Sequence, residues 1–373
     1  MALTHVREIL TLMKDDHKRL VLPGPVEVRP EVLEAQAQWM IGHRSSEFAE
    51  LFGALQSKLK QVFKTENRVY VSGSSGTGLW EGASRNAIRD DKKALHLIGG
   101  AFSERWAKIS QANGKQIDTL AVDWGQAHTP EMLEDALGQG EYDAVCVVHN
   151  ETSTGVTNPI QAMGEVMREK ASDTLFMVDS VSGLLGAEIH ADDWNIDLLL
   201  TSGQKAFALP PGIAFASVSD RLLERAKQIE NRGYYFDFLT WEKYIQKNNT
   251  ASTPPVSLIY AADRQLEDVL AEGLENRWQR HTQMREITHQ WVNNRGFGFF
   301  AQEGYRSPTI TCVDNTREID VFEMANYMAD HGYEIDKGYG KIKGQTFRIA
   351  HMGDIPVNIL EEYLSELDAF LGV

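Results

Sequence analysis

The chain has 373 residues, of which 42% are hydrophobic and 24% charged, a composition typical of a folded globular protein rather than a disordered, fibrous or membrane chain. Its 37 basic and 53 acidic side chains give a formal net charge of -16, which disfavours nucleic acid as a partner. The length exceeds what one hydrophobic core usually organises, so we expect a large and a small domain.

The two cysteines, Cys146 and Cys312, lie in apolar runs that are typical of buried strands, where a thiol acts as a small hydrophobe. Residues 1–19 have helical amphipathicity but no long apolar core with a cleavage site, and no later segment approaches a membrane span. We therefore expect a cytoplasmic protein in a reducing compartment, without a membrane partner and without a metal site.

The first break in regular structure is Pro23-Gly24-Pro25, which cannot be helical and must cross the surface or a cleft in extended form. Gly24 would let the backbone come close to a ligand there. Helical periodicity follows over residues 31–41 and 46–63, and the joint between them exposes His43 and Arg44.

From Arg68 onward, short apolar runs alternate with helical segments such as Pro130–Leu137 and Ile160–Lys170. This alternation predicts an α/β fold with a mainly parallel sheet that is covered by helices on both faces. The expected strands lie within residues 68–73, 94–100, 119–123, 144–150, 175–181, 196–202 and 212–219.

A long helical stretch from Val256 to about Asn294 is expected to lead out of the large domain. A smaller α+β unit follows, with strands within residues 308–314, 332–336 and 346–352 and helices over 319–331 and 355–371. We expect an N-terminal segment over residues 1–20, which packs on the small domain or on a dimer partner, a large domain over 21–260 and a small domain over 261–373.

Polar residues end several of the expected strands, and ligands of open parallel sheets bind outside the carboxyl ends of the strands. The glycine-rich run SGSSGTG, residues 72–78, offers backbone N–H groups and the start of a helix to a phosphate, with hydroxyls from Ser75 and Thr77 around Gly76. The run matches neither the dinucleotide nor the Walker pattern, so a tight structural turn is an equally good interpretation of the loop alone.

Asp179 and Lys205 also stand at strand ends. A carboxylate that emerges from a buried strand is costly unless it meets a cation, such as a protonated pyridine nitrogen. A partly desolvated lysine can form an imine with an aldehyde and later transfer protons. Taken singly, Asp179 is at least as well interpreted as an aspartate that caps a turn, and Lys205 as a solvated surface lysine, as either is as a cofactor contact.

The joint order of these motifs is more specific. With PGP near the start, the runs HRSSEF, SGSSGTG, ETSTGV, VDSVSG, SGQKA and LPPG resemble the class V aminotransferases of fold type I, across nearly the whole chain. That group includes alanine–glyoxylate, serine–glyoxylate and serine–pyruvate aminotransferases. The resemblance implies pyridoxal 5′-phosphate (PLP) as cofactor and a large domain with a mainly parallel, seven-stranded sheet.

The resemblance also implies a role for each matching residue. Lys205 would be the Schiff-base lysine and Asp179 the partner of the ring nitrogen. Arg348, in TFRIAHMG, would bind the substrate carboxylate, for which the bidentate geometry of arginine is well suited. The further implied contacts are Phe102 on the pyridine face, Thr152 at the phenolic oxygen, Ser75, Gly76, Thr77 and Gln204 at the phosphate, Thr253 of a neighbouring subunit at the same phosphate, and Gly24 beside the substrate.

His43 and Arg44 would line the partner's active site or bind across a homodimer. Two positions depart from some relatives, because Phe102 replaces a tryptophan and Thr77 a histidine. Neither cysteine lies on a loop near the small domain, which argues against a cysteine desulfurase.

The expected reaction is a ping-pong transfer of an amino group from serine or alanine to glyoxylate or pyruvate. Phosphoserine is the alternative donor, because HRSSEF also resembles part of the phosphoserine aminotransferases. A nicotinamide-dependent oxidoreductase that uses the same glycine loop is a remoter alternative.

Overall fold

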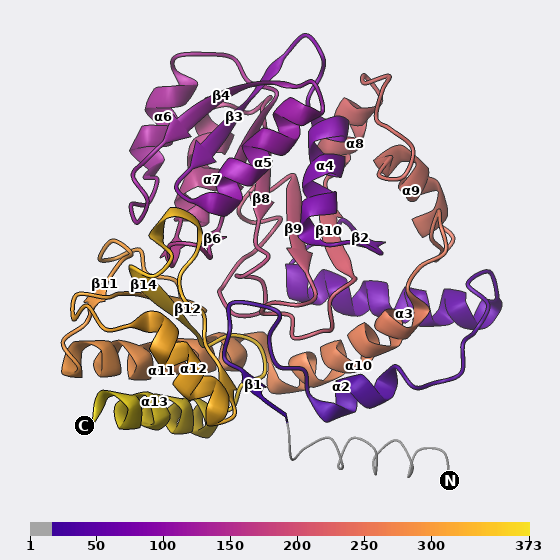
Figure 1. Cartoon of the computed structure of the whole chain (residues 1–373). Helices are drawn as coiled ribbons and strands as arrows, with labels where there is room; N and C mark the ends of the chain where they lie inside the picture. Colours follow the sequence, from indigo (N-terminus) through magenta and orange to yellow (C-terminus); the bar gives the residue numbers. More distant parts are fainter. Residues whose placement is uncertain (1–16) are drawn as a thin grey trace.

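The computed structural model describes residues 17–373, so the helix expected at the N-terminus lies outside the described residues. A seven-stranded sheet with the order β2-β10-β9-β8-β5-β3-β4 forms the centre of the molecule (Figure 1). β10 runs antiparallel to both of its neighbours, and the other pairs are parallel. The α/β class with a mainly parallel sheet is confirmed. The strands are β2 (Arg68–Ser72), β3 (Lys93–Ile98), β4 (Gln116–Ala121), β5 (Ala144–Val148), β8 (Leu175–Asp179), β9 (Leu198–Ser202) and β10 (Ala214–Val218).

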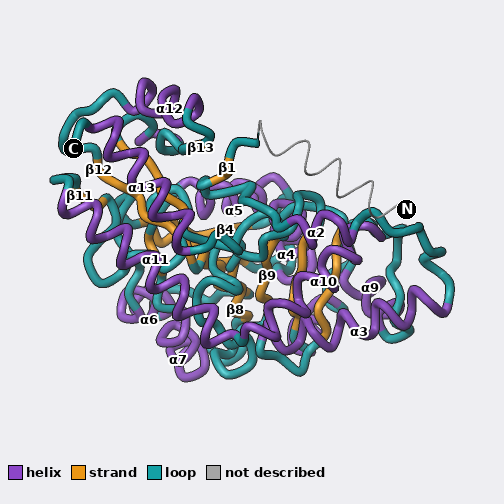
Figure 2. The backbone as a smooth tube through the Cα atoms, turned by 90° about the horizontal axis from the view of Figure 1, so that it is seen from below, coloured by secondary structure: helices purple, strands orange, loops and turns teal. Residues whose placement is uncertain are grey.

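Side chains that alternate along the central strands fill two separate cores. In β5, Val145 and Val147 join one core, whereas Cys146 and Val148 join the other. Helices cover both faces, so strands lie inside and helices outside when the molecule is turned (Figure 2). The first face is covered by α3 (Ser46–Phe63), α6 (Pro130–Leu137), α7 (Ile160–Lys170) and α10 (Val256–Glu272), and the second by α4 (Gly76–Ala87), α5 (Ala101–Ala112), α8 (Asp220–Ala226) and α9 (Phe238–Ile245).

The C-terminal unit has its own core between a three-stranded antiparallel sheet and three helices. The N-terminal segment reaches this unit, because β1 (Arg19–Leu20) pairs in parallel with β13 (Tyr333–Glu334). The expected domain limit at residue 260 falls within α10 and stays a prediction. The remaining elements are β11 (Gly298–Phe299), β12 (Ile310–Asp314), β14 (Thr346–Ala350), α11 (Leu274–Asn294), α12 (Val321–Asp330), α13 (Val357–Leu371), a 3₁₀ turn (Gly340–Ile342), and a hairpin of β6 (Asn150–Glu151) with β7 (Val156–Thr157).

Two expected helices end differently in the structure. α2 covers Pro30–Ala35 and does not continue to Ile41. Trp39 is 94% exposed and Met40 59%, so these two side chains gain no burial that would stabilise another helical turn. The single helix expected over 256–294 is divided at Gly273, whose φ of +83° lies in the region that glycine tolerates best.

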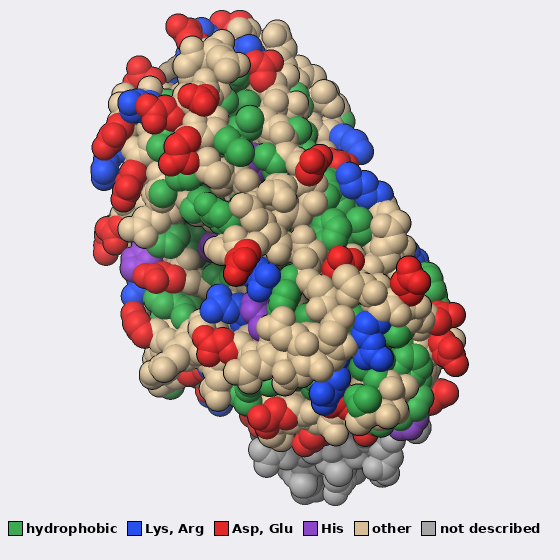
Figure 3. Space-filling view, turned by 90° about the vertical axis from the view of Figure 1, so that its left-hand side faces the viewer, with side chains coloured by type: hydrophobic (Ala, Val, Ile, Leu, Met, Phe, Trp, Pro, Cys, Tyr) green, Lys and Arg blue, Asp and Glu red, His purple; other side chains and the backbone are tan. Residues whose placement is uncertain are grey.

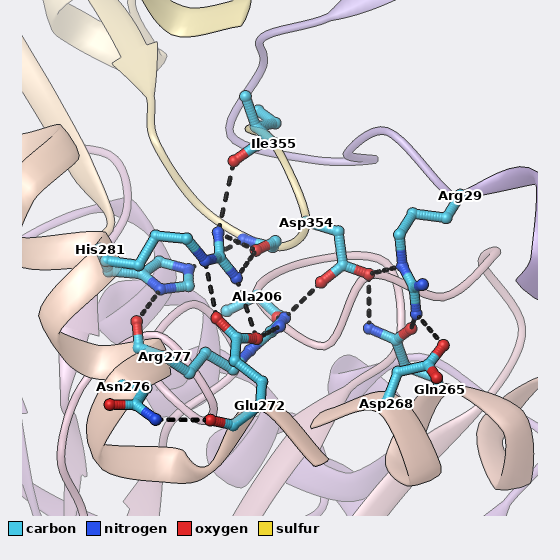
Figure 4. Close-up of polar contacts among 12 residues, drawn as sticks. Arg29, Ala206, Gln265, Asp268, Glu272, Asn276, Arg277, His281, Asp354 and Ile355 are labelled. Carbon is cyan, nitrogen blue, oxygen red and sulfur yellow. Dashed lines mark hydrogen bonds and ion pairs between the residues drawn. The ribbon is translucent and has the colours of Figure 1, made fainter. Parts of the chain in front are cut away.

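A largely buried network of ion pairs joins Arg29, which precedes α2, to α10, α11 and the loop after β14 (Figure 4). At its centre, Asp354 accepts hydrogen bonds from Arg29 Nε at 2.7 Å and Gln265 Nε2 at 2.8 Å, and pairs with Arg277 Nη2 at 2.8 Å. Arg277 and Gln265 also reach the carbonyl oxygens of Ala206 and Phe207, the two residues after Lys205. The network therefore supports the turn that carries the lysine.

Acidic and basic side chains are interspersed on the face shown in Figure 3, which agrees with the scattered excess of acid in the sequence. No helix within residues 17–373 is long and apolar enough to cross a bilayer.

Candidate active site

A cavity of about 180 Å³ opens at the carboxyl ends of β2, β5, β8 and β9. It brings together residues that are up to 130 positions apart in the sequence, including eight of the nine that the sequence predicts to hold the cofactor. These eight are Ser75, Gly76, Thr77, Phe102, Thr152, Asp179, Gln204 and Lys205. The strand-end rule therefore located the cavity correctly.

Lys205 follows β9 in a buried turn, and its Nζ donates a hydrogen bond to the carbonyl oxygen of Pro23. The backbone of Gly24 crosses directly over the lysine, because a Cβ at Gly24 would lie 2.5 Å from Nζ. Burial, and next the charge of Arg348, lower the pKa of Lys205 to about 8. The neutral amine that a nucleophile or base requires is therefore accessible near neutral pH.

Asp179 ends β8 with its side chain only 3% exposed. Its carboxylate accepts hydrogen bonds from Trp80 Nε1 and from the backbone N–H of Val181, both at 2.7 Å. Neither donor carries a charge, and burial raises the pKa of Asp179 to about 7 despite both bonds. A cationic group in the cavity would restore the ionised form.

The glycine-rich loop delivers the first turn of α4 to the same cavity. α4 begins at Gly76 after Ser75, whose side chain makes no capping hydrogen bond and so stays available to a ligand. A Cβ at Gly76 would lie 2.8 Å from Val181 Cγ2, which shows how closely this turn packs on the chain after β8. The free N–H groups of a helix start and the helix dipole favour a phosphate at this place.

Phe102 stands at the start of α5, and a buried carboxylate fixes that start. Glu151 is 2% exposed and accepts hydrogen bonds from the backbone N–H of Phe102 at 3.3 Å and of Ser103 at 3.0 Å, and from Ser153 Oγ at 2.6 Å. The positive end of the helix favours this charge. The ring of Phe102 stacks on Tyr339 with centroids 5.3 Å apart, so it lies between the cofactor residues and the C-terminal unit.

Arg348 extends from β14 to Thr152 of the cavity lining and is 4% exposed. Its Nη1 donates a hydrogen bond to the carbonyl oxygen of Thr152 at 2.8 Å, and its Nε and Nη2 donate to the carboxylate of Asp336. The hydroxyl of Thr152 is 2.6 Å from Ser182 Oγ. The predicted carboxylate-binding arginine thus contacts a predicted cofactor residue directly.

Three predicted residues lie elsewhere in the single chain. Arg44 donates a hydrogen bond to the carbonyl oxygen of Thr250 at 2.6 Å and also binds Asn249. Thr253 lines a different cavity, together with Gly73 and Tyr235. His43 joins neither lining. Their expected roles involve a neighbouring subunit and stay predictions.

The chain matches the family Aminotransferase class-V over residues 31–342, which is most of its length. It belongs to the class V aminotransferases. An uncharacterised aminotransferase of Methanocaldococcus jannaschii is 38% identical over 340 residues, covering 90% of this chain and 88% of the relative. The serine–glyoxylate aminotransferase of Methylorubrum extorquens is 32% identical over 90% of this chain and 86% of its own. The crystal structure of an alanine–glyoxylate aminotransferase from Nostoc sp. superposes with a TM-score of 0.90 at 29% identity, over 95% of both chains.

The residues of this aminotransferase fit PLP, the cofactor of its family. The buried Asp179 carboxylate matches a protonated ring nitrogen, and the helix start at Gly76 matches a phosphate. Asn150 lines the same cavity with a buried Nδ2 that has no hydrogen-bond partner among residues 17–373, so a polar group of a ligand would satisfy it. Lys205 would supply the amine to which the aldehyde binds.

Sequence reasoning missed several residues of the aminotransferase's site. Trp80 lies four positions after Gly76, one helical turn further along α4, so helical spacing alone indicates it. Glu151 lies beside Thr152 in the ETSTGV run and was passed over. Arg105 lies three positions after Phe102 on α5 and lines the cavity, so helical spacing indicates it as well. Asp336 and Tyr339 gave no local signal, because they meet Arg348 and Phe102 only through the packing of the C-terminal unit.

Proposed function

We propose that this aminotransferase transfers an amino group from a small amino acid, serine or alanine, to a 2-oxo acid, glyoxylate or pyruvate, by a ping-pong mechanism. One observation carries the proposal. Asp179 at the end of β8 and Lys205 just after β9 line one cavity, and Arg348 of β14 donates a hydrogen bond to Thr152 of the same lining. An amine, an acid partner and a carboxylate-binding cation can therefore act on the same small molecule. The names of the serine–glyoxylate and alanine–glyoxylate relatives support these substrates.

PLP supplies an electron sink that makes the Cα–H bond of the substrate acidic. Asp179 holds the ring nitrogen protonated, Phe102 packs on the ring face, and Thr152 donates to the phenolic oxygen. Ser75, Gly76, Thr77 and Gln204 bind the phosphate. With the cofactor and substrate bound, Lys205 Nζ would remove the proton from the substrate Cα as a general base and return a proton as a general acid.

Arg348 binds the α-carboxylate of both substrates, since the amino donor and the oxo acid use the site in turn. The backbone at Gly24 limits the space beside Lys205, which suits a small substrate. Within residues 17–373, no three His, Cys, Asp or Glu side chains gather as metal ligands would.

We also propose a homodimer with shared active sites, in which Thr253 contacts the phosphate of the neighbouring subunit and His43 and Arg44 lie near it. The exposed side chains of Trp39, Tyr234 and Tyr235 support an interface, because large apolar side chains at 94%, 91% and 47% exposure gain by burial against another chain. A cytoplasmic location accords with two buried, free cysteines.

Phosphoserine as donor finds less support than serine or alanine. The solved phosphoserine aminotransferases are 24% and 16% identical to this chain, whereas the serine–glyoxylate aminotransferase of Methylorubrum extorquens is 32% identical. Membership of the aminotransferase family also removes the nicotinamide-dependent oxidoreductase as an alternative.

The test has two parts. Purified protein with added PLP is expected to show a visible cofactor band that borohydride fixes to Lys205, and initial rates are then compared for serine, alanine and phosphoserine with glyoxylate, pyruvate and 2-oxoglutarate. Lys205→Ala is expected to lose about 10⁴-fold in multiple-turnover rate, the upper range for a positioned acid–base group. Retained turnover in Lys205→Ala, or a preference for phosphoserine, would contradict the proposal.

A further inference from the structure

Arg348 has five N–H groups, and three of them donate hydrogen bonds within the protein. Nε donates to Asp336 Oδ1 at 2.6 Å, Nη2 to Asp336 Oδ2 at 2.7 Å, and Nη1 to the carbonyl oxygen of Thr152 at 2.8 Å. The aromatic ring of Tyr339 lies beside the guanidinium, with Cζ 5.3 Å from the ring centroid. Among residues 17–373 no other partner is recorded for the guanidinium, so one N–H on each terminal nitrogen is left.

Asp336 is itself held in place. The backbone N–H of Gly338 donates to its Oδ1 at 2.9 Å, and the backbone N–H of Arg348 donates to its carbonyl oxygen at 3.1 Å. Gly338 has a φ of +80°, and a Cβ there would lie 2.7 Å from the carbonyl oxygen of Thr346, so the chain after Asp336 is pressed onto β14. Backbone and side chain together fix the carboxylate against one edge of the arginine.

We propose that Asp336 is a positioning residue for substrate binding, which orients Arg348 so that its two remaining N–H groups receive the α-carboxylate of the amino acid and of the oxo acid. This inference rests on the proposed function and adds a residue that the sequence did not indicate. The physical reason is the cost of a buried cation. Arg348 is 4% exposed and has a flexible side chain, so without a counter-charge it would leave the cavity or adopt several rotamers.

The arrangement separates orientation from binding. Asp336 occupies the side edge of the guanidinium in a bidentate pair, which is the strongest geometry for holding an arginine. The substrate carboxylate therefore does not displace Asp336 and uses donors that the protein leaves open. Both halves of the ping-pong cycle depend on these donors, so loss of Asp336 weakens both substrates together.

The test is Asp336→Asn, which keeps the shape and removes the charge. KM is expected to rise roughly 10- to 100-fold for the amino acid and for the oxo acid, the loss associated with one hydrogen bond to a charged group, while kcat changes less than about threefold. Glu334→Gln is the matched control, because Glu334 lies two residues earlier and its side chain is 42% exposed. It is expected to keep the wild-type KM.

A second readout separates this role from a merely structural one. The negative charge of Asp336 opposes the lowering of the Lys205 pKa by burial and by Arg348, with Asp179 acting in the same sense as Asp336 and Arg105 against it. Asp336→Asn is therefore expected to move the pH midpoint of cofactor attachment to the apoprotein downward, whereas Glu334→Gln leaves it in place. A fall in melting temperature with both KM values and the midpoint unchanged would overturn the inference.

Two further outcomes are also informative. If Asp336→Asn does not fold, Asp336→Glu keeps the charge but displaces the carboxylate, and it is expected to raise both KM values; unchanged values overturn the inference. If the wild type turns over no substrate pair, the proposed function is wrong, and the inference is then judged by calorimetric binding of acetate to the wild type and to Asp336→Asn. Equal affinities of the wild type and of Asp336→Asn for acetate would contradict the inference.

Discussion

The residues predicted to bind the cofactor and those predicted to bind or orient near the substrate, named the cofactor half and the substrate half of the site, come from different parts of the chain. The cofactor half, defined by Ser75–Thr77, Phe102, Thr152, Asp179, Gln204 and Lys205, consists of residues at or just after the ends of strands of one sheet or at the helix starts beside them. The substrate half, defined by Pro23–Pro25, Asp336, Tyr339 and Arg348, comes from the chain before α2 and from the C-terminal unit.

The two halves also balance charge differently. In the cofactor half, Asp179 accepts hydrogen bonds from two neutral donors, and burial raises its pKa to about 7, so the carboxylate depends on a cation that a ligand brings. In the substrate half, Arg348 already has its counter-ion in Asp336. The first half is completed by its cofactor, whereas the second is pre-organised by the protein itself.

The largest effect that tests this contrast is expected from Asp179→Asn. The amide cannot hold the ring nitrogen in its protonated form, so we expect kcat to fall about 100- to 1,000-fold, in the range for loss of a pre-organised electrostatic contact. Steady-state kinetics of the PLP-loaded protein measures this loss.

Asp173→Asn is the control for that variant, since Asp173 is exposed just before the same strand and is expected to have no effect. A fall of less than about fivefold for Asp179→Asn would break the contrast, because it would mean that the buried carboxylate does not act on the cofactor.

An intermediate effect is expected at the ion-pair network around Asp354. Burial alone would raise the pKa of Asp354, but the charges of Arg277 and Arg29 outweigh it and hold that pKa below its usual value. Asp354→Ala leaves two arginines short of a partner and is expected to lower the free energy of unfolding by about 3 kcal/mol. Chemical denaturation measures the change (Figure 4).

The sign of the pH dependence follows from the depressed pKa. The contribution of Asp354 is complete above the pKa of an unfolded aspartate, about 4, and is lost as the pH falls toward the folded-state value. The difference between wild type and variant should therefore shrink in acid. Glu362→Gln removes an exposed partner of Arg19 and is expected to lower the free energy of unfolding by less than about 1 kcal/mol. Equal losses for Glu362→Gln and Asp354→Ala would contradict a special role of the network around Asp354.

The smallest expected effect concerns the rate at which the apoprotein takes up PLP. The pKa of Lys205 is lowered to about 8, and only its neutral form attacks the aldehyde, so the rate should rise about tenfold per pH unit up to pH 8 and then level off. Stopped-flow absorbance measures this profile. A midpoint near the ordinary lysine value of 10.5 would show that the lysine is not desolvated before the cofactor arrives.

The sequence by itself determined the sheet, the cavity and its cofactor half. Apolar runs such as residues 144–148 and 175–179 specify buried parallel strands, and the residue that ends such a run is placed at the ligand-binding edge by the topology of any open sheet. Asp179 and Lys205 were therefore within reach of local reasoning, and the order of the motifs made them specific.

The sequence indicated Arg348 and Gly24 through the family resemblance, but only the tertiary structure decided which residues they contact. Asp336 meets Arg348 through the register of β14 with the chain after β13, and Gly24 meets Lys205 across 181 residues of sequence. Such contacts depend on how one unit packs on another, and no local periodicity encodes that packing. Tertiary packing also explains the short α2, whereas the break at Gly273 follows from the positive φ that a glycine accepts.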